Sequence, residues 1–186
     1  VSNGWISSIT SKGRTFRLKG RSIYRYTIIE MVSKVDNTNS GHNPVGRFMV
    51  AVGAVITNPA GEILLIKRSS KLDWHPGEWE IMYGRIAQHE DPKSGLVREV
   101  GEELGIKIVA GAPLTCWHIY RGQEEIAENE LIGITFLAIT DQIEIKLSNE
   151  HEEYRWVTPT EALELIKVEG IKRDINAYVN LQGETS

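Results

Sequence analysis

The stretch GRIAQHEDPKSGLVREVGEELGI, residues 84–106, decides the fold because it contains a helix whose two ends are both marked. Asp91 suits the N-cap position, and Pro92 suits the first helical position, where proline loses no hydrogen bond. Gly105 suits the left-handed residue that commonly ends a helix. The sequence therefore predicts a helix that begins at Asp91 and runs through Leu104.

Three glutamates of this helix, Glu99, Glu102 and Glu103, have the spacing i, i+3 and i+4, so their carboxylates project from one face. Like charges at this spacing repel one another, while Arg98 is a single neighbouring charge and Lys93 is more than a turn away. A divalent cation would neutralise the cluster, because Mg²⁺ takes carboxylate oxygens together with substrate phosphate oxygens. The alternative is a solvated acidic face.

The glutamates belong to a longer pattern that covers the whole stretch. From Gly84 to Ile106 the chain matches G-x5-E-x7-R-E-U-x-E-E-x-G-U without a gap, where U is an aliphatic residue. In this pattern the chain resembles the Nudix (MutT-like) hydrolase superfamily. The resemblance implies an α+β fold over roughly residues 46–182, in which a mixed β-sheet lies between helices in an α/β/α sandwich.

The same resemblance implies an enzyme that hydrolyses a phosphoric anhydride bond. Its substrate would be a nucleoside diphosphate linked to another moiety, and water would attack phosphorus beside glutamate-bound Mg²⁺ or Mn²⁺. Such ions neutralise the negative charge of the substrate and lower the pKa of a bound water. We therefore expect a metal-dependent nucleotide pyrophosphohydrolase with a small-molecule nucleotide as its partner.

The resemblance also implies a role for each polar residue of the pattern. Glu102 and Glu103 correspond to metal ligands, and Glu99 is either a ligand or the group that orients or deprotonates water. Arg98 corresponds to an arginine that pairs with a glutamate of the pattern and fixes its orientation. Glu90 corresponds to a loop glutamate that supports this pair.

Two further metal contacts are expected outside the helix. Gly84 corresponds to the position whose backbone carbonyl reaches a metal, where a side chain would obstruct. A further acidic ligand often precedes a late strand in this family, and Glu150 is the first candidate here, with Glu153 second. His151 between them is either a base at neutral pH or a surface histidine without a role.

Candidate substrate contacts combine aromatic and basic side chains. Trp79, Tyr83 and Trp117 are candidates for a wall on which a nucleobase stacks. Arg68 and Arg121 are candidates for phosphate contact, because a guanidinium group fits phosphate oxygens. Packing in the core and solvated surface charge are the alternatives. Family members commonly have Pro-Gly or Pro-Lys before the first glycine of the pattern, whereas Tyr83 precedes it here, so loop shape and substrate preference are expected to differ.

Composition sets the remaining limits on the chain. With 186 residues, 41% hydrophobic and 25% charged, one packed domain with a small extension is expected. A net charge of −4 provides no general attraction to nucleic acid or an anionic membrane, so neither is expected as a partner. The sequence has no long apolar run and no secretory signal, which indicates a cytoplasmic protein. The single cysteine, Cys116, excludes an internal disulfide.

Residues 1–43 form a basic extension with seven basic and two acidic residues. Residues 22–35 permit either a strand or a helix, and residues 37–44 are expected to be a linker. The extension either adds a strand or a homodimer contact, or it is non-native upstream sequence with Met31 as the natural start. A basic arm that contacts RNA or substrate phosphate is a further alternative.

Beyond the linker, the pattern of apolar residues predicts many strands and two further helices. Strands are predicted at residues 48–57, 62–68, 78–82, 107–110, 114–120, 130–140, 143–147 and 154–157, with the first two as a hairpin. A capping box at Thr158 and Glu161 predicts a helix through Lys167, and a last helix is predicted from Ile171 to Leu181.

Two other functions compete with the hydrolase. The chain could be a non-catalytic module that senses nucleotides or has a regulatory role, although a pure binder has no reason to keep every ligand. The segment KRSSKLDWHPGEW, residues 67–79, resembles the loop of isopentenyl diphosphate isomerases. Those isomerases use a cysteine ahead of the pattern, and this chain has none there.

Overall fold

The computed structural model describes residues 6–10, 13–18, 21–22, 48–122 and 124–183. The chain divides into two compact units, Val1–Pro44 and Val45–Ser186. In the first unit β1 (Ile6–Thr10), β2 (Gly13–Leu18) and β3 (Arg21–Ser22) form an antiparallel sheet. Residues 23–47, which include most of the ambiguous segment, Met31 and the expected linker, lie outside the described residues, so their assignments stay predictions.

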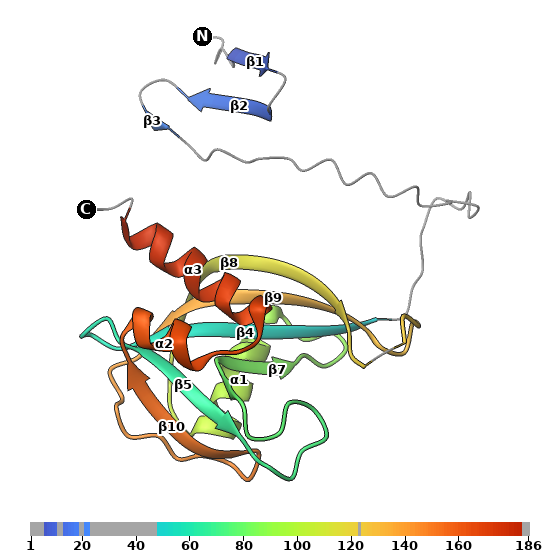
Figure 1. The fold of residues 1–186 in the computed structure, drawn as a ribbon, viewed down its shortest axis with the longest axis vertical. Helices are drawn as coiled ribbons and strands as arrows, with labels where there is room; N and C mark the ends of the chain where they lie inside the picture. The colour runs from blue at the N-terminus through green and yellow to red at the C-terminus, as the bar shows by residue number, and fades with distance from the viewer. Residues whose placement is uncertain (1–5, 11–12, 19–20, 23–47, 123, 184–186) are drawn as a thin grey trace. The chain divides into compact units, whose positions relative to one another are not determined.

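The second unit is built on a seven-stranded mixed sheet, shown in Figure 1. Its strands are β4 (Met49–Thr57), β5 (Ile63–Arg68), β6 (Trp79–Glu80), β7 (Met82–Arg85), β8 (Val109–Tyr120), β9 (Glu130–Ile139) and β10 (His151–Val157). The main path has the order β10-β5-β4-β9-β8, while β6 pairs with β5 and β7 pairs with β4. β4 and β9 are parallel and the other pairs are antiparallel, so the sheet is mixed as predicted.

Helices cover both faces of this sheet, with α1 (Pro92–Leu104) on one side and α2 (Pro159–Leu165) and α3 (Glu169–Gly183) on the other (Figure 1). Successive side chains along a strand point to opposite faces of the sheet. Val52 of β4 packs in the same buried cluster as Leu96 of α1, whereas Val55 packs with Ile175 of α3. The α+β sandwich predicted from the sequence is confirmed.

The ends of α1 form as the sequence predicts. The Asp91 carboxylate accepts hydrogen bonds from the backbone N–H groups of Lys93 at 3.1 Å and Ser94 at 3.0 Å. Pro92 occupies the first turn, and Gly105 ends the helix in the left-handed region with φ of 65°. These local contacts explain why the boundaries of this helix could be predicted from sequence alone.

The predicted hairpin of the first two strands is wrong beyond its turn. β4 and β5 share only the pair Thr57 and Ile63. After the turn the strands diverge, because β4 is occupied by β7 on one side and β9 on the other, while β5 pairs with β6 and β10. Separate strands are predicted at residues 107–110 and 114–120. The structure instead has one continuous strand, β8, which begins at Val109 and has register shifts near Pro113.

The predicted strand at residues 143–147 is wrong, although its side chains alternate as in a strand. Its backbone caps α1 instead of joining the sheet. The N–H of Lys146 donates to the carbonyl of Leu104 at 2.9 Å, and the N–H of Ser148 donates to the carbonyl of Glu103 at 2.7 Å. The last carbonyls of a helix lack partners within the helix, so this segment satisfies them.

The C-terminal helices are close to their predicted positions. The capping box of α2 is confirmed, with Thr158 and Glu161 bonded reciprocally. α3 begins at Glu169, two residues earlier than predicted, and places Ile171, Ile175 and Tyr178 in the core. None of the helices in the described part of the chain is long and apolar enough to cross a membrane.

The packing of α1 on the sheet generates a stability prediction. Leu96 is 0% exposed, whereas its neighbour Val97 is 43% exposed. Leu96→Ala should lower the free energy of unfolding by about 2–5 kcal/mol because it leaves a cavity in the core. Val97→Ala on the same helix is the control and should change it by less than about 0.5 kcal/mol. Urea unfolding of both variants measures the difference, and equal losses would contradict this packing.

Candidate active site

A cavity of about 360 Å³ opens in the second unit, and it gathers acidic, basic and aromatic side chains. Strands β4 and β7, helices α1 and α3, and the loop of residues 69–78 contribute to its lining. Its glutamates are Glu78, Glu80, Glu99, Glu103 and Glu150, its arginines are Arg68, Arg85, Arg121 and Arg173, and its large aromatics are Trp74, Trp79, Tyr83 and Trp117. The candidate substrate residues of the sequence, Arg68, Trp79, Tyr83 and Arg121, therefore all face this cavity.

The contact between Gly84 of β7 and Glu99 of α1 fixes where the helix lies. A Cβ atom on Gly84 would overlap the side chain of Glu99, so any larger residue would push the helix away. Both residues line the cavity, and the Glu99 side chain is only 13% exposed. The glycine is thus needed for close approach of strand and helix, while a metal contact by its carbonyl stays a prediction.

Arg98 braces the loop before α1 against the helix. Its Nε and Nη2 donate to the two carboxylate oxygens of Glu90 at 2.7 and 2.9 Å. Its Nη1 contacts Glu99 at 3.0 Å and Glu102 at 2.9 Å. The hydrogen bonds from Arg98 and from the N–H of Ala87 lower the pKa of Glu90 to about 2. This carboxylate therefore stays ionised at neutral pH and holds Arg98 in place.

Glu102 lies apart from the other glutamates of the pattern. Its carboxylate is 61% exposed, contacts Arg98, and is absent from the cavity lining. Glu99 and Glu103 both line the cavity. In this structure the helix thus presents two of its three glutamates to the cavity and the third to solvent.

Glu103 is the most strongly perturbed carboxyl group of the cavity. Its side chain is 12% exposed. Burial, followed by the charges of the neighbouring carboxylates Glu150, Glu99 and Glu80, raises its pKa from 4.5 to about 8. Burial and like charges both disfavour the ionised form. A positive charge placed among these groups would remove the penalty.

His151 is buried between two glutamates, which excludes the surface position that the sequence left open. It is 7% exposed, with Nε2 3.4 Å from Glu80 and Nδ1 3.7 Å from Glu103. Nδ1 has no hydrogen-bond partner among the described residues. A buried polar atom without a partner is costly, so this nitrogen marks a place where the site lacks a polar ligand.

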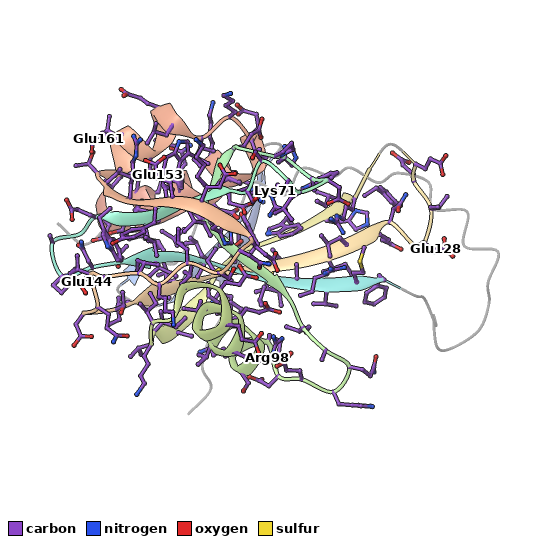
Figure 2. The ribbon with its side chains drawn as sticks, turned by 90° about the horizontal axis from the view of Figure 1, so that it is seen from below. Lys71, Arg98, Glu128, Glu144, Glu153 and Glu161 are labelled. Carbon is purple, nitrogen blue, oxygen red and sulfur yellow. The ribbon has the colours of Figure 1, made fainter. Side chains whose placement is uncertain are left out.

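The two extra candidate ligands before β10 have different positions. Glu150 lines the cavity, and its backbone carbonyl accepts a hydrogen bond from the N–H of Ser69 at 2.8 Å. Glu153 pairs with Arg155 at 2.7 Å and does not line the cavity. Figure 2 shows it beside β10, well separated from Arg98 on α1. Of these two glutamates, Glu150 is the one that faces the cavity, and its role as a metal ligand stays a prediction.

The aromatic part of the cavity is held by polar contacts. The Tyr83 and Trp117 rings meet edge to face with centroids 5.8 Å apart. Arg121 contacts Asp73 at 3.2 Å and lies 5.9 Å from the centre of the Trp74 ring. Burial, followed by the charge of the nearby Asp174, raises the pKa of Tyr83 well above its usual value. Its hydroxyl is therefore protonated and acts as a donor.

Two carboxylates of the site were missed in the sequence. Glu80 bonds Arg68 at 2.9 Å and contacts His151. Asp174 is fully buried on α3, where it accepts the Tyr83 hydroxyl at 3.0 Å. A signal existed for Asp174, because it lies on the same helical face as the apolar residue Ile171, where a charged side chain needs a partner.

The arrangement fits a hard divalent cation, by its donor set and by its uncompensated charge. Glu99, Glu103 and Glu150 supply carboxylate oxygens, which Mg²⁺ and Mn²⁺ prefer. The raised pKa of Glu103 indicates that a positive group belongs nearby, and the unpartnered His151 nitrogen indicates that a polar partner is missing there. Within residues 48–122 and 124–183, however, no three such side chains converge closely enough to form a preformed metal site.

Comparison with known proteins agrees with this fold. Residues 47–178 match the NUDIX domain. The chain is 31% identical over 116 residues to a CTP pyrophosphohydrolase of Escherichia coli, covering 62% of this chain and 81% of that protein. It is 27% identical over 130 residues to an isopentenyl-diphosphate Delta-isomerase of Kocuria rhizophila, covering 68% and 71%. The crystal structure of a MutT protein from Methanosarcina mazei superposes with a TM-score of 0.61 at 30% identity, covering 76% and 99%.

Fold and site together define a hydrolase of phosphoric anhydride bonds with a glutamate-rich helix beside a substrate cavity. The chain belongs to the Nudix family. Members of this family typically use divalent metal ions. The resemblance seen in residues 84–106 is therefore confirmed.

The environment of Glu103 generates a pH prediction for the metal-free protein. The folded-state pKa of about 8 lies above the ordinary value of 4.5, so the folded protein holds a proton that the unfolded chain releases. Stability should therefore fall as pH rises from about 4.5 to about 8 and then level off. Glu103→Gln should remove this loss, so its Tm in EDTA should exceed that of the wild type by an amount that grows over this range.

The exposed Glu102 provides the control for that experiment. Glu102→Gln changes the same chemical group one position earlier, on a side chain that is 61% exposed. Its Tm profile between pH 5 and 9 should run parallel to that of the wild type. A Glu103→Gln profile that is also parallel would show that Glu103 is not the strained carboxyl group.

Proposed function

We propose that this Nudix hydrolase is a metal-dependent nucleotide pyrophosphohydrolase that cleaves a diphosphate bond in a nucleoside diphosphate linked to another moiety. The observation that carries the proposal is a cavity in which glutamates, Glu99 and Glu103 among them, adjoin an aromatic and basic wall. The similarity to a CTP pyrophosphohydrolase supports a nucleotide as substrate. In this reaction the glutamates would serve the phosphate chemistry, and the aromatic and basic wall would bind the nucleoside.

Glu99, Glu103 and Glu150, with the backbone of Gly84, are the proposed metal-holding groups. Bound Mg²⁺ or Mn²⁺ would neutralise the charge of the diphosphate and lower the pKa of water. Glu102 belongs to the proposed set through the family pattern. Its carboxylate contacts Arg98 in this structure, so its participation requires that ion pair to open.

The protein groups that handle the attacking water lie in the same place. Glu99 is proposed either as a ligand or as the carboxylate that orients the water and accepts its proton. Its carboxylate contacts Arg98 on one side. On the other side its side chain packs directly against the backbone of Gly84, where a Cβ atom would overlap it. Glu90 acts indirectly, because it holds Arg98 through two hydrogen bonds. A positioned carboxylate is effective because its orientation is set before the reaction.

The basic and aromatic side chains are proposed to bind the rest of the substrate. Arg121 and Arg68 face the cavity and offer guanidinium N–H groups to phosphate oxygens. Tyr83 and Trp117 offer ring surface to a nucleobase, and Trp79 lines the same cavity. Arg68 bonds the buried Glu80 and the carbonyl of Trp74, whereas Arg121 pairs with Asp73, which is 84% exposed, so Arg121 is the more available of the two arginines.

The two alternatives have less support from the site. A nucleotide-sensing module would not need a buried cluster of mutually repelling glutamates. Isomerase chemistry is suggested by the relative from Kocuria rhizophila. The sole cysteine of the chain, Cys116, is exposed on β8 and does not line the cavity. Hydrolysis is therefore the preferred proposal.

Metal dependence is tested with Glu103→Gln and a matched control. EDTA should abolish hydrolysis, and added Mg²⁺ should restore it in the wild type. Glu103→Gln should lower kcat by about a hundredfold or more, because a proposed ligand loses its charge. Glu128→Gln, an exposed glutamate in the loop between β8 and β9 (Figure 2), should retain full activity. Equal activity of all three proteins would remove Glu103 from the catalytic set.

The substrate is tested with a panel of nucleotides. It should include nucleoside triphosphates, ADP-ribose, NADH, diadenosine polyphosphates and triphosphorylated RNA, with release of phosphate or pyrophosphate as the measurement. We expect Mg²⁺-dependent turnover of at least one small nucleotide. Tight binding of a nucleotide without turnover would favour the sensing module, and turnover of isopentenyl diphosphate alone would favour the isomerase.

A further inference from the structure

Asp174 is a fully buried carboxylate at the centre of a hydrogen-bond network between α3 and the sheet. It accepts the hydroxyl of Thr115 on β8 at 2.7 Å, that of Thr135 on β9 at 2.6 Å, and that of Tyr83 on β7 at 3.0 Å. Its exposed fraction is 0%. Donors from three strands thus converge on one helical side chain, which is more than is needed to attach a helix to a sheet.

The direction of each hydrogen bond in this network is fixed. The indole N–H of Trp117 donates to the Thr135 hydroxyl oxygen at 3.0 Å. A hydroxyl has one hydrogen, so Thr135 donates that hydrogen to Asp174. Trp117, Thr135 and Asp174 therefore form a polarised chain that ends on an acceptor. An ionised carboxylate is the group best suited to that position.

Two glycines give the aromatic rings of this network their places on the sheet. A Cβ atom on Gly53 of β4 would overlap the Tyr83 ring, and a Cβ atom on Gly133 of β9 would overlap the Trp117 ring. The rings therefore lie close against the strands, where they form the aromatic floor of the cavity. We use this name for Tyr83 and Trp117.

Arg173 connects the same carboxylate to the cavity wall. Its Nη2 and Nε lie 3.0 and 3.2 Å from one oxygen of Asp174. The Arg173 side chain is 51% exposed and lines the cavity, whereas Asp174 does not line it. Any effect of Asp174 on a substrate must therefore pass through the groups that it holds.

We propose that Asp174 is a positioning residue for substrate recognition, whose carboxylate fixes the aromatic floor and Arg173 for a nucleoside moiety. This inference rests on the proposed function. Because the Tyr83 hydroxyl and the Trp117 N–H are already bonded, the floor offers its ring faces to the base, and Arg173 offers the remaining N–H groups. Loss of the carboxylate should loosen the floor and the wall together, while the glutamates on α1 stay in place.

The kinetic test compares Asp174→Asn with Ile175→Val. The first variant keeps the shape of the side chain but removes its charge and one acceptor, so KM should rise by about tenfold while kcat at saturation stays within about threefold. The Mg²⁺ concentration for half-maximal activity should not change. Ile175 is the adjacent buried residue on α3, and its truncation weakens packing without touching the network. An equal rise in KM for Ile175→Val, or a fall in kcat alone, would overturn the proposal.

A second measurement does not depend on activity. The Trp117 indole N–H, identified in the NMR spectrum through Trp117→Phe, should exchange slowly with solvent in the wild type and in Ile175→Val. It should exchange rapidly in Asp174→Asn and in Thr135→Val. The second variant changes the shape of the side chain little, so it serves as a test if Asp174→Asn does not fold. Thr135→Val removes the direct acceptor and sets the scale of full loss, so unchanged protection in Asp174→Asn would overturn the positioning role.

The two measurements separate this inference from the proposed function. If the wild type turns over no nucleotide but Asp174→Asn and Thr135→Val lose the protection of Trp117, the proposed hydrolysis fails while the positioning of the floor stands. If hydrolysis is found but Asp174→Asn leaves both KM and protection unchanged, only the role of Asp174 fails.

Discussion

Repulsion among carboxylates in a poorly hydrated place is the constraint on which the rest of this structure depends. Glu103, Glu99 and Glu80 each have side chains no more than 13% exposed, and burial together with the neighbouring carboxylates opposes the ionisation of Glu103. The fold keeps them close by anchoring their supports elsewhere. Arg98 is fixed by Glu90, and Gly84 lets β7 approach the helix. Under the proposed function, the stability lost in this way maintains a site for a divalent cation.

On the opposite side of the sheet a buried carboxylate is stabilised by hydrogen bonds. There a single negative charge, Asp174, is buried, and hydroxyl donors with one guanidinium group satisfy it. The strand β4 separates the two arrangements, with Val52 packed toward α1 and Gly53 covered by Tyr83. The repelling cluster lines the cavity directly, whereas the satisfied carboxylate reaches it only through the side chains that it holds, Tyr83 and Arg173. Under the proposed function, the first suits a cation that arrives with substrate, and the second suits a surface that must not move.

Sequence reasoning succeeded where the determining contacts are local. The limits of α1 follow from Asp91, Pro92 and Gly105, and the spacing of its glutamates follows from the helix itself. It could not predict that Glu103 is buried while Glu102 is exposed, because the direction of each side chain depends on Arg98 and on burial against the sheet. Glu80 and Asp174 escaped notice for the same reason, since their partners are distant in the chain.

The segment that caps the C-terminal end of α1 also sets the number of residues between this cap and Glu150. Hydrogen bonds from Lys146 and Ser148 to the last turn of the helix fix the starting point of the chain, and Glu150 follows two residues later. The position of Glu150 relative to Glu103 is therefore set by the number of residues that follow Ser148. Insertions before residue 146 can bulge into solvent, but one added residue between 148 and 150 would put the wrong side chain opposite Glu103. Evolution can vary the outer part of this loop freely only while those few residues keep their count.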